Sequence, residues 1–256
     1  MKQSQAKKRD NAMTNKILMG LIALVLGLLF LEILIVHSKN EQQKNASNQV
    51  QTARIMANGD LLYHDALYMS ALQADGSYDF TENFTYVKPG LKQADLVLGD
   101  FEGTINPDYP LSGYPLFNAP QSVTAAIKDA GYDVMDLAHN HILDSGLEGA
   151  FTTADAFKKV GIDPIGVYEK PVRDKAPLLI KNVNGIKVAI LSYAYGYNGL
   201  ESNLTDKEVA DHLSNLDEKR MKAEIQRAEK EADITVIMPQ MGVEYRLEPT
   251  DEQVKL

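Results

Sequence analysis

From residue 54 to the end of the chain, apolar residues form short uninterrupted runs that end at glycine or at charged residues. Runs of this length, bounded by turn-forming residues, are typical of strands that are buried on both faces of a sheet. They predict strands at residues 54–60, 96–100, 134–138, 163–167 and 234–238. Because helical patterns separate most of these runs, the sequence predicts an α/β domain.

Amphipathic periodicity marks the helices between these strands. Residues 122–130 place apolar side chains on one side and stop at Gly131, and residues 146–160 do the same before Gly161. Glycine after the last turn is a common helix terminator, because it adopts the left-handed conformation without strain. A charge-rich segment at residues 204–231 is predicted to be mostly helical, with a solvated outer face.

Turn and loop signals connect the remaining elements. Residues 178–183 and 186–193 flank an Asn-Gly dipeptide at 184–185, which favours a type I′ turn and predicts a β-hairpin. Residues 78–90 show no clear period and predict a loop with short irregular structure. Residues 106–120 contain four prolines, which hinder regular strand pairing, so they predict a long ordered excursion.

The amino-terminal part of the chain predicts a membrane anchor. Residues 17–36 are apolar except for Glu32, and at ~1.5 Å per residue they span the ~30 Å hydrocarbon core of a bilayer. The preceding residues 1–16 hold five cationic residues and one acidic residue, so the positive-inside rule places them in the cytoplasm and the rest of the chain outside. A cleaved signal peptide is the alternative, but its apolar region is shorter, at about 7–15 residues. Residues 37–53 are polar and predict a linker to the domain at 54–256.

Composition and charge exclude several classes of function. The chain has no cysteine, which excludes disulfides, thiolate metal sites and a cysteine nucleophile. Its net charge is −9, and because residues 1–16 carry +4, the remainder carries −13. This acidic balance argues against nucleic acid as a partner.

The densest group of chemically active side chains lies at residues 133–144, which contain two histidines, an asparagine and three aspartates. This segment follows a predicted strand, so His139, Asn140 and His141 lie on the loop that leaves the strand's carboxyl end, where open α/β sheets bind ligands. The alternative for either histidine is packing in a polar pocket. Alternation along the strand predicts that His139 is the packed residue, whereas Asn140 and His141 enter the turn.

Two other predicted strands end in Gly-Asp, at Asp60 and at Asp100. If the chain turns helical after Gly59, Asp60 and His64 share one helix face, so that a carboxylate and an imidazole can point at one ion. The plainer alternative is a turn with an aspartate at the helix N-cap. Carboxylate, imidazole and amide groups together favour Zn²⁺, Mn²⁺ or Fe over Ca²⁺.

Taken together and in order, these motifs resemble the bacterial capsule-synthesis CapA family, also called poly-γ-glutamate capsule proteins. The resemblance covers about residues 52 to 256 and depends on residues 58–60, 94–103, 133–144 and 241–245. The family is similar in fold to calcineurin-like metallophosphoesterases, which are two-sheet α/β/β/α sandwiches with metal ligands at the strand ends. The resemblance implies this sandwich for the domain, after one transmembrane helix.

The resemblance also implies a role for five residues, carried over by position. Asp60 and Asp100 correspond to metal ligands, and His64 is the companion of Asp60. Asn140 corresponds to a further metal ligand, and His141 to the group that protonates the leaving group or polarises the phosphoryl oxygen. The cofactor implied is a divalent metal ion, either Mn, Fe or Zn.

Two departures from the family pattern change this expectation. The chain has Gln240 and Met241 where the family usually has histidine and tryptophan, so one expected imidazole ligand is an amide. The chain ends at Leu256, where residues 250–253 predict the capped start of a further helix, before the family's last histidine-rich segment. The sequence thus predicts a domain that is incomplete at its carboxyl end, which argues against a complete dinuclear phosphoesterase site.

The resemblance implies a single-pass cell-membrane protein with an extracytoplasmic domain, acting in capsule or cell-envelope polymer biosynthesis or export. Its expected partners are the membrane and an anionic envelope polymer, such as poly-γ-glutamate, or the machinery that makes the polymer. One alternative is a metal-dependent extracellular phosphoesterase that uses Asp60, Asp100, Asn140 and His141. A second alternative is a binding module that has the same fold without catalysis.

Overall fold

The computed structural model describes residue 28, residues 31–39 and residues 50–256. The chain divides into two units, and the second begins at Gln51. The predicted cytoplasmic tail, much of the predicted transmembrane segment at 17–36 and most of the predicted linker lie outside the described residues. In the part of the chain that is described, no helix has both the length and the hydropathy needed to cross a membrane.

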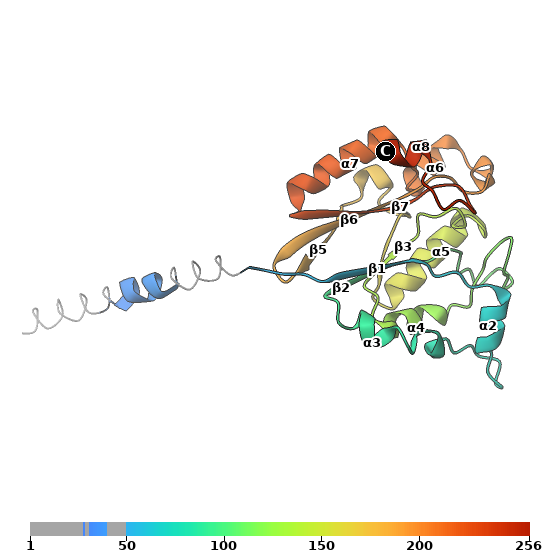
Figure 1. Ribbon diagram of the computed structural model, residues 1–256, viewed down its shortest axis with the longest axis horizontal. Helices are drawn as coiled ribbons and strands as arrows, with labels where there is room; N and C mark the ends of the chain where they lie inside the picture. The colour runs from blue at the N-terminus through green and yellow to red at the C-terminus, as the bar shows by residue number, and fades with distance from the viewer. Residues whose placement is uncertain (1–27, 29–30, 40–49) are drawn as a thin grey trace, which may run out of the picture. The chain divides into compact units, whose positions relative to one another are not determined.

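Four parallel strands form the first sheet of the second unit (Figure 1). Their order is β1-β2-β3-β4, and their bounds are Ile55–Asp60, Leu96–Asp100, Val134–Asp136 and Asp163–Ile165. Because all four strands run in the same direction, their carboxyl ends meet at one edge of the sheet. The predicted strands are confirmed at these places, which positions the polar residues that follow them.

Two strands of this sheet are shorter than the sequence predicts. β3 and β4 each end two residues early, at Asp136 and Ile165. The Asp136 side chain accepts a hydrogen bond of 2.7 Å from the N–H of Ala138, and this turn ends β3. A polar side chain that bonds to its own backbone competes with the ladder of the sheet.

The second sheet has three strands in the order β5-β6-β7, with bounds Leu179–Val183, Ile186–Ala194 and Ile234–Gln240. β5 and β6 form the predicted antiparallel hairpin. Asn184 and Gly185 have φ angles of 53° and 89°, as both central residues of a type I′ turn require. β7 pairs with β6 in parallel, so the chain must cross over between them.

This crossover contains two helices, α6 at Asp206–His212 and α7 at Glu218–Glu231, where the sequence predicts one mostly helical segment. Residues between them bond to the ends of other strands. The N–H of Ser214 donates to Gly166, and that of Leu216 donates to Ala194. These backbone bonds replace helical ones, so the helix is interrupted there.

Most of the other helices cover the first sheet or the strand ends, and η2 lies beside α6 and α7. The two longer ones, α4 and α5, span Val123–Ala130 and Gly146–Lys159, and end before the left-handed residues Gly131 and Gly161 as predicted. The shorter helices are α2 (Asp65–Ala71), α3 (Lys88–Leu91), α8 (Asp251–Lys255), η1 (Thr81–Phe84), η2 (Arg173–Lys175) and η3 (Leu200–Asn203).

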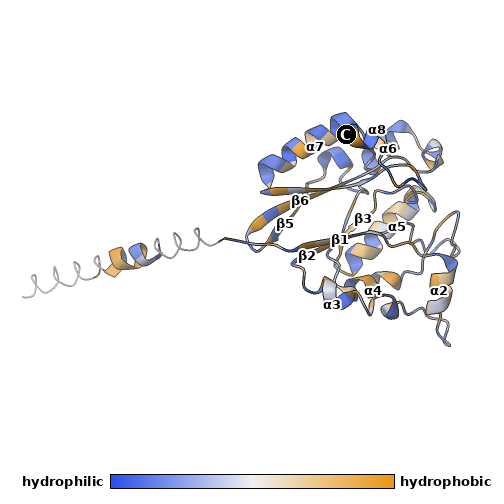
Figure 2. Cartoon of the chain, viewed as in Figure 1, coloured by the Kyte–Doolittle hydropathy of each residue, from blue (hydrophilic) through white to orange (hydrophobic). Residues whose placement is uncertain are grey.

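Alternating side chains show that the unit has four layers. Leu98 of β2 and Val188 of β6 belong to one buried group between the two sheets. Val97 packs on the opposite face of the first sheet with α4 and α5, and Ala189 packs on the opposite face of the second sheet with α7. Figure 2 shows hydrophobic strands β1 and β2 and a mostly hydrophilic α7. The arrangement is an α/β/β/α sandwich, which explains why the strands are continuous apolar runs.

A buried ion pair joins α7 to η2. Arg173 is 2% exposed and donates two hydrogen bonds, of 3.0 and 2.9 Å, to the carboxylate of Glu224. It also donates to the carbonyl of Leu213 and to the side chain of Asn215, and its guanidinium lies over the ring of Tyr193. Since four of the five N–H groups of the guanidinium are paired, this cluster has a structural role.

Candidate functional site

Three aspartates lie side by side at the carboxyl ends of β1, β2 and β3. Asp60 pairs with Asp100 across the first two strands, and Asp100 pairs with Asp136 across the next two. Asp60 is exposed, whereas Asp100 and Asp136 are 8% and 3% exposed. The row of carboxyl groups therefore runs from the solvent into the interior.

Burial changes the ionisation of this row. Burial, followed by the charges of Asp136 and Asp60, raises the pKa of Asp100 to about 9. Burial also raises the pKa of Asp136 to about 8, although the N–H of Ala138 stabilises its charged form. For Glu102, burial and a hydrogen bond with Asp60 raise the pKa to about 7. These carboxyl groups keep their protons far above the pH at which exposed ones lose them.

His141 lies between two carboxylates. Its Nδ1 is 2.8 Å from Oδ2 of Asp144, and its Nε2 is 3.7 Å from Oε1 of Glu102. Burial lowers the pKa of His141, but the hydrogen bond and charge of Asp144 and the charges of Glu102 and Glu244 outweigh it, so that the pKa is raised overall. The bond from Asp144 fixes the ring, which suits a group that gives a proton from Nε2.

His64 does not share a helix face with Asp60, contrary to the conditional expectation from the sequence. β1 continues to Asp60, and His64 is the extended N-cap residue of α2. The exposed His64 ring lies edge-on to Phe117, with ring centroids 4.9 Å apart, and Phe117 is 4.8 Å from His141 in the same way. The ring of Phe117 therefore lies in contact with both histidine rings.

Asn140 is held by the amide of Gln240 in β7 and by that of Asn198 in the loop after β6. Its backbone N–H donates to Oε1 of Gln240 at 2.8 Å, and its Oδ1 accepts from Nε2 of Gln240 at the same distance. Its Nδ2 donates to Oδ1 of Asn198 at 3.2 Å. The oxygen that was expected to bind a metal is thus already an acceptor for Gln240.

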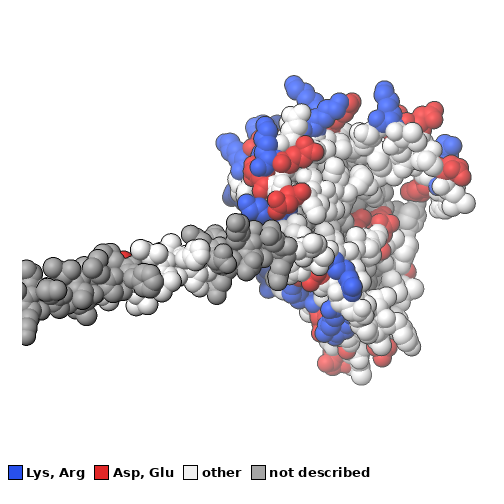
Figure 3. All heavy atoms as spheres, turned by 60° about the vertical axis from the view of Figure 1, so that its left-hand side comes forward, with Lys and Arg blue, Asp and Glu red and all other residues white. Residues whose placement is uncertain are grey.

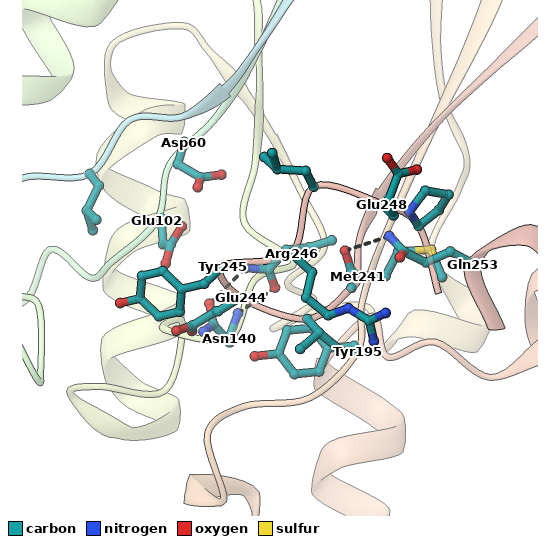
Figure 4. Close-up of a pocket in the computed structure, with 16 residues that line it drawn as sticks. Asp60, Glu102, Asn140, Tyr195, Met241, Glu244, Tyr245, Arg246, Glu248 and Gln253 are labelled. Atoms are coloured by element: carbon teal, nitrogen blue, oxygen red, sulfur yellow. Dashed lines mark hydrogen bonds between the residues drawn. The ribbon is translucent and has the colours of Figure 1, made fainter. Parts of the chain in front are cut away.

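A pocket of about 640 Å³ opens at these strand ends (Figure 4). Its wall contains Asp60, Glu102 and Asn140 on one side and residues 240–249 on the other. Tyr195 at the end of β6 also lines it. The pocket is therefore formed where the carboxyl ends of both sheets meet, as expected for a ligand site in such folds.

The predicted ligands do not fit a metal ion as a set. Among the described residues, no three His, Cys, Asp or Glu side chains are arranged to hold one. The oxygen of Asn140 accepts one hydrogen bond from Gln240, which leaves its second lone pair, and His64 faces Phe117. Only the carboxylates fit a cation by their chemistry, since Oδ1 of Asp100 is buried without a hydrogen-bond partner in the described chain.

The structure brings together four of the five predicted site residues and adds others. Asp60 and Asn140 line the pocket, Asp100 lies beside Asp60, and His141 lies beside Glu102. The additional residues are Glu102, Asp136, Asp144, Asn198 and Gln240. Four of them had a signal in the sequence: Asp136 and Asp144 belong to the acid-rich segment at 133–144, Glu102 belongs to the motif at 94–103, and Gln240 stands where the family usually has a histidine.

His139 is the packed histidine, as the alternation along the strand predicts. Its side chain is fully buried, and its Nδ1 accepts a hydrogen bond of 3.2 Å from the backbone N–H of His141. Burial, followed by the charge of His141, lowers the pKa of His139 to about 3. A neutral, buried ring in this position supports the loop that carries His141.

Fold and site together define the class of protein: an α/β/β/α domain that gathers carboxylates, an imidazole and amides at its strand ends. Within this class the chain belongs to the family described as bacterial capsule synthesis protein PGA_cap, whose model matches residues 54–256. The resemblance to the CapA family is thereby confirmed.

Two curated relatives carry the CapA name. The capsule biosynthesis protein CapA of Bacillus anthracis is 30% identical over 182 residues, which are 68% of this chain and 43% of that protein. The PGA biosynthesis protein CapA of Bacillus subtilis (strain 168) is 25% identical over 252 residues, which are 97% of this chain and 64% of that protein. The chain thus spans less than two thirds of the length of these relatives.

Solved structures with a similar chain path include two hydrolases. A Staphylococcus aureus protein described as a 5′-nucleotidase, in complex with α-ketoglutarate, is 15% identical with a TM-score of 0.49, covering 77% of this chain and 39% of that one. The sulfate thiohydrolase SoxB of Thermus thermophilus, in complex with glycerol, is 15% identical with a TM-score of 0.38, covering 63% of this chain and 29% of that one.

Proposed function

We propose that this chain is a membrane-anchored, extracytoplasmic protein that takes part in the biosynthesis or export of an anionic capsule or cell-envelope polymer of the poly-γ-glutamate type. Its membership of the PGA_cap family supports a role in capsule synthesis, as do the names of the CapA relatives. The apolar run at 17–36 and the cationic residues before it support the anchor and its orientation.

The pocket at the strand ends is the observation that carries this proposal for the domain itself. Of the four carboxyl groups that line it, Glu102 is buried and its pKa is raised to about 7, whereas Asp60, Glu244 and Glu248 are exposed. Arg246 adds a positive charge at the wall. On the face that Figure 3 shows, cationic and acidic side chains are interspersed, without an extended basic track for nucleic acid.

Deletion of the gene in the producing bacterium tests this proposal. We expect the strain to lose cell-surface polymer, measured by extraction and amino-acid analysis, and to regain it when the full chain is supplied. Protease added to intact cells should remove the domain and leave a short membrane fragment. Normal polymer levels in the deletion strain would contradict the role, and a domain that is protected in intact cells would contradict the topology.

A second candidate function is phosphoester hydrolysis outside the cell. The observation in its favour is the pairing of His141 with Asp144, which orients an imidazole at the edge of the acidic pocket. We expect a hydrolase to release 4-nitrophenol from 4-nitrophenyl phosphate when Mn²⁺, Fe²⁺ or Zn²⁺ is added. His141→Ala should then lower the rate by about 10²–10⁴-fold, as loss of a positioned general acid does.

A third candidate function is that of a non-catalytic binding module. Complementation of the deletion strain with variants of the chain distinguishes it from a hydrolase. A hydrolase needs the proton carried by His141, so His141→Ala should fail to restore the polymer in the deletion strain. A binding module needs the shape and charge of the pocket, so the same variant should restore it. His139→Ala serves as the control for stability, because its ring is buried and does not line the pocket.

A further inference from the structure

The outer wall of the pocket is a strap, which we define as residues 242–249. Both of its ends are fixed. At the first end, Gln240 is bonded twice to Asn140. At the second end, Thr250 begins α8 with a capping box, and Nε2 of Gln253 donates to the carbonyl of Met241 at 3.3 Å. The strap therefore forms a closed loop over the site.

Between these fixed ends the strap is exposed and strained. Tyr245 and Leu247 are fully exposed, although both side chains are apolar over most of their surface. Tyr245 has a φ angle of 61°, which is an unfavourable conformation for a bulky side chain. Backbone strain of this kind persists where the surrounding structure imposes it, and it is concentrated at ligand sites.

Arg246 follows the strained residue directly. Among the described residues that line the pocket, Arg246 is the one with a cationic side chain. The same wall has carboxyl groups from Asp60, Glu102, Glu244 and Glu248. Within the described chain Arg246 forms no ion pair with any of them. Figure 4 shows its guanidinium pointing away from Asp60 and Glu102. An exposed guanidinium at a pocket wall can bind an incoming oxyanion through two parallel hydrogen bonds.

We propose that the strap is the polymer-recognition element of the site, that Arg246 binds an oxyanion group of the polymer, and that the preceding residue, Tyr245, makes a separate apolar contact with it. This inference rests on the proposed function, because it names the residue that holds the polymer. The oxyanion is either a carboxylate of a γ-glutamyl chain or a phosphate of a polyol-phosphate chain. Carboxylate and phosphate groups each present two oxygens that can accept parallel hydrogen bonds from a guanidinium.

Binding by the full 256-residue chain in detergent tests the proposal. A fluorescent γ-glutamate oligomer and a fluorescent glycerol-phosphate oligomer serve as the two probes, and dextran serves as the neutral competitor. We expect Arg246→Ala to raise the Kd for the bound oligomer about tenfold or more, since hydrogen bonds to charged groups contribute about 1.5–3 kcal/mol. Arg246→Lys should lie between that variant and the unaltered protein. The oligomer that binds more tightly identifies the oxyanion.

The matched control is Lys219→Ala, which removes the same charge from an exposed position of α7 outside the pocket. It should change the Kd less than twofold. Trypsin supplies a second readout, because it cuts after Arg246, and bound oligomer should slow this cut in the unaltered chain. Equal Kd values for the unaltered chain and Arg246→Ala, or binding of neither oligomer, would overturn the inference. Neither result bears on the deletion phenotype, which tests the proposed function separately.

Discussion

Asn140 and Gln240 are a hundred residues apart in the chain and share two hydrogen bonds of 2.8 Å. One residue follows β3 of the first sheet, and the other ends β7 of the second. The amide of Gln240 uses both its oxygen and its nitrogen, and Asn140 is 5% exposed. This amide pair therefore links the two sheets at the edge of the pocket through hydrogen bonds.

If the role of this pair is to hold the two sheets together, its loss should reduce stability without affecting metal affinity. We expect Asn140→Ala and Gln240→Ala each to lower the free energy of unfolding by about 1–2 kcal/mol. The double variant should lose less than the sum, with a coupling of about 1 kcal/mol. Urea denaturation measures these free energies. The control is a double-mutant cycle in which the exposed Gln93 is substituted by alanine instead of Gln240. Calorimetric titration with Mn²⁺ is the second measurement. A large loss of Mn²⁺ affinity in Asn140→Ala would show that Asn140 is a metal ligand.

The carboxylate of Asp144 should control the ionisation of His141. We expect Asp144→Asn to lower the pKa of His141, because burial then acts against the imidazolium with less compensation. Glu244→Gln should lower it less, since Glu244 acts through charge alone. Proton NMR titration of the imidazole measures both. An unchanged pKa in Asp144→Asn would mean that the 2.8 Å contact does not persist in solution.

Stability should fall as the pH rises. The folded protein holds protons on Asp100, Asp136 and Glu102 at pH values where the unfolded chain has lost them. Their folded pKa values of about 9, 8 and 7 lie above the ordinary ones, so this stabilisation is complete below pH ~4 and is lost toward pH 7–9. The free energy of unfolding should therefore decrease steadily as the pH rises through this range.

Denaturation in buffers with EDTA, from pH 5 to pH 9, measures this slope. Asp100→Asn should flatten it, because an amide does not titrate. The exposed Asp155→Asn is the control and should leave the slope unchanged. A slope that is flat in the unaltered protein would show that these carboxyl groups are ionised in the folded state.

Removal of Arg173 should be among the most damaging changes outside the site. Arg173→Met leaves the carboxylate of Glu224 without its charged partner, and breaking a buried pair in this way costs about 3–5 kcal/mol. Arg173→Met with Glu224→Leu should recover part of the loss. The control is Lys222→Met, whose partner Glu218 is exposed, with an expected effect of less than about 0.5 kcal/mol. Melting temperatures rank the three variants.

Much of the fold could be predicted from the sequence because its central strands, β2, β3 and most of β6, are buried on both faces. Continuous apolar runs therefore marked the strands, and glycines with positive φ marked the ends of α4 and α5. The break between α6 and α7 was not predictable, because backbone bonds from Ser214 and Leu216 to distant strands cause it. Helical propensity carries no information about such tertiary partners.

The site was predictable only where its residues follow strands. Asp60 and Asp100 were found because Gly-Asp ends both strands, and parallel pairing then places them together. Asp136 was missed as a member of this row because β3 was predicted to continue past it. The pairing of Asn140 with Gln240 was invisible, since it joins two sheets whose packing one sequence does not specify.

β1, the strand that carries Asp60, lies at the edge of the first sheet and has β2 as its strand neighbour. Among the described residues it is also the first strand of the chain, and the residues before it are tied to the β5–β6 turn, where Nδ2 of Asn184 donates to the carbonyl of Thr52 at 3.0 Å. An edge strand can be peeled away while the rest of its sheet remains paired. Local opening of β1 would then remove one carboxylate from the row and leave Asp100 and Asp136 paired, so the pocket would lose Asp60 before the sheet itself unfolds.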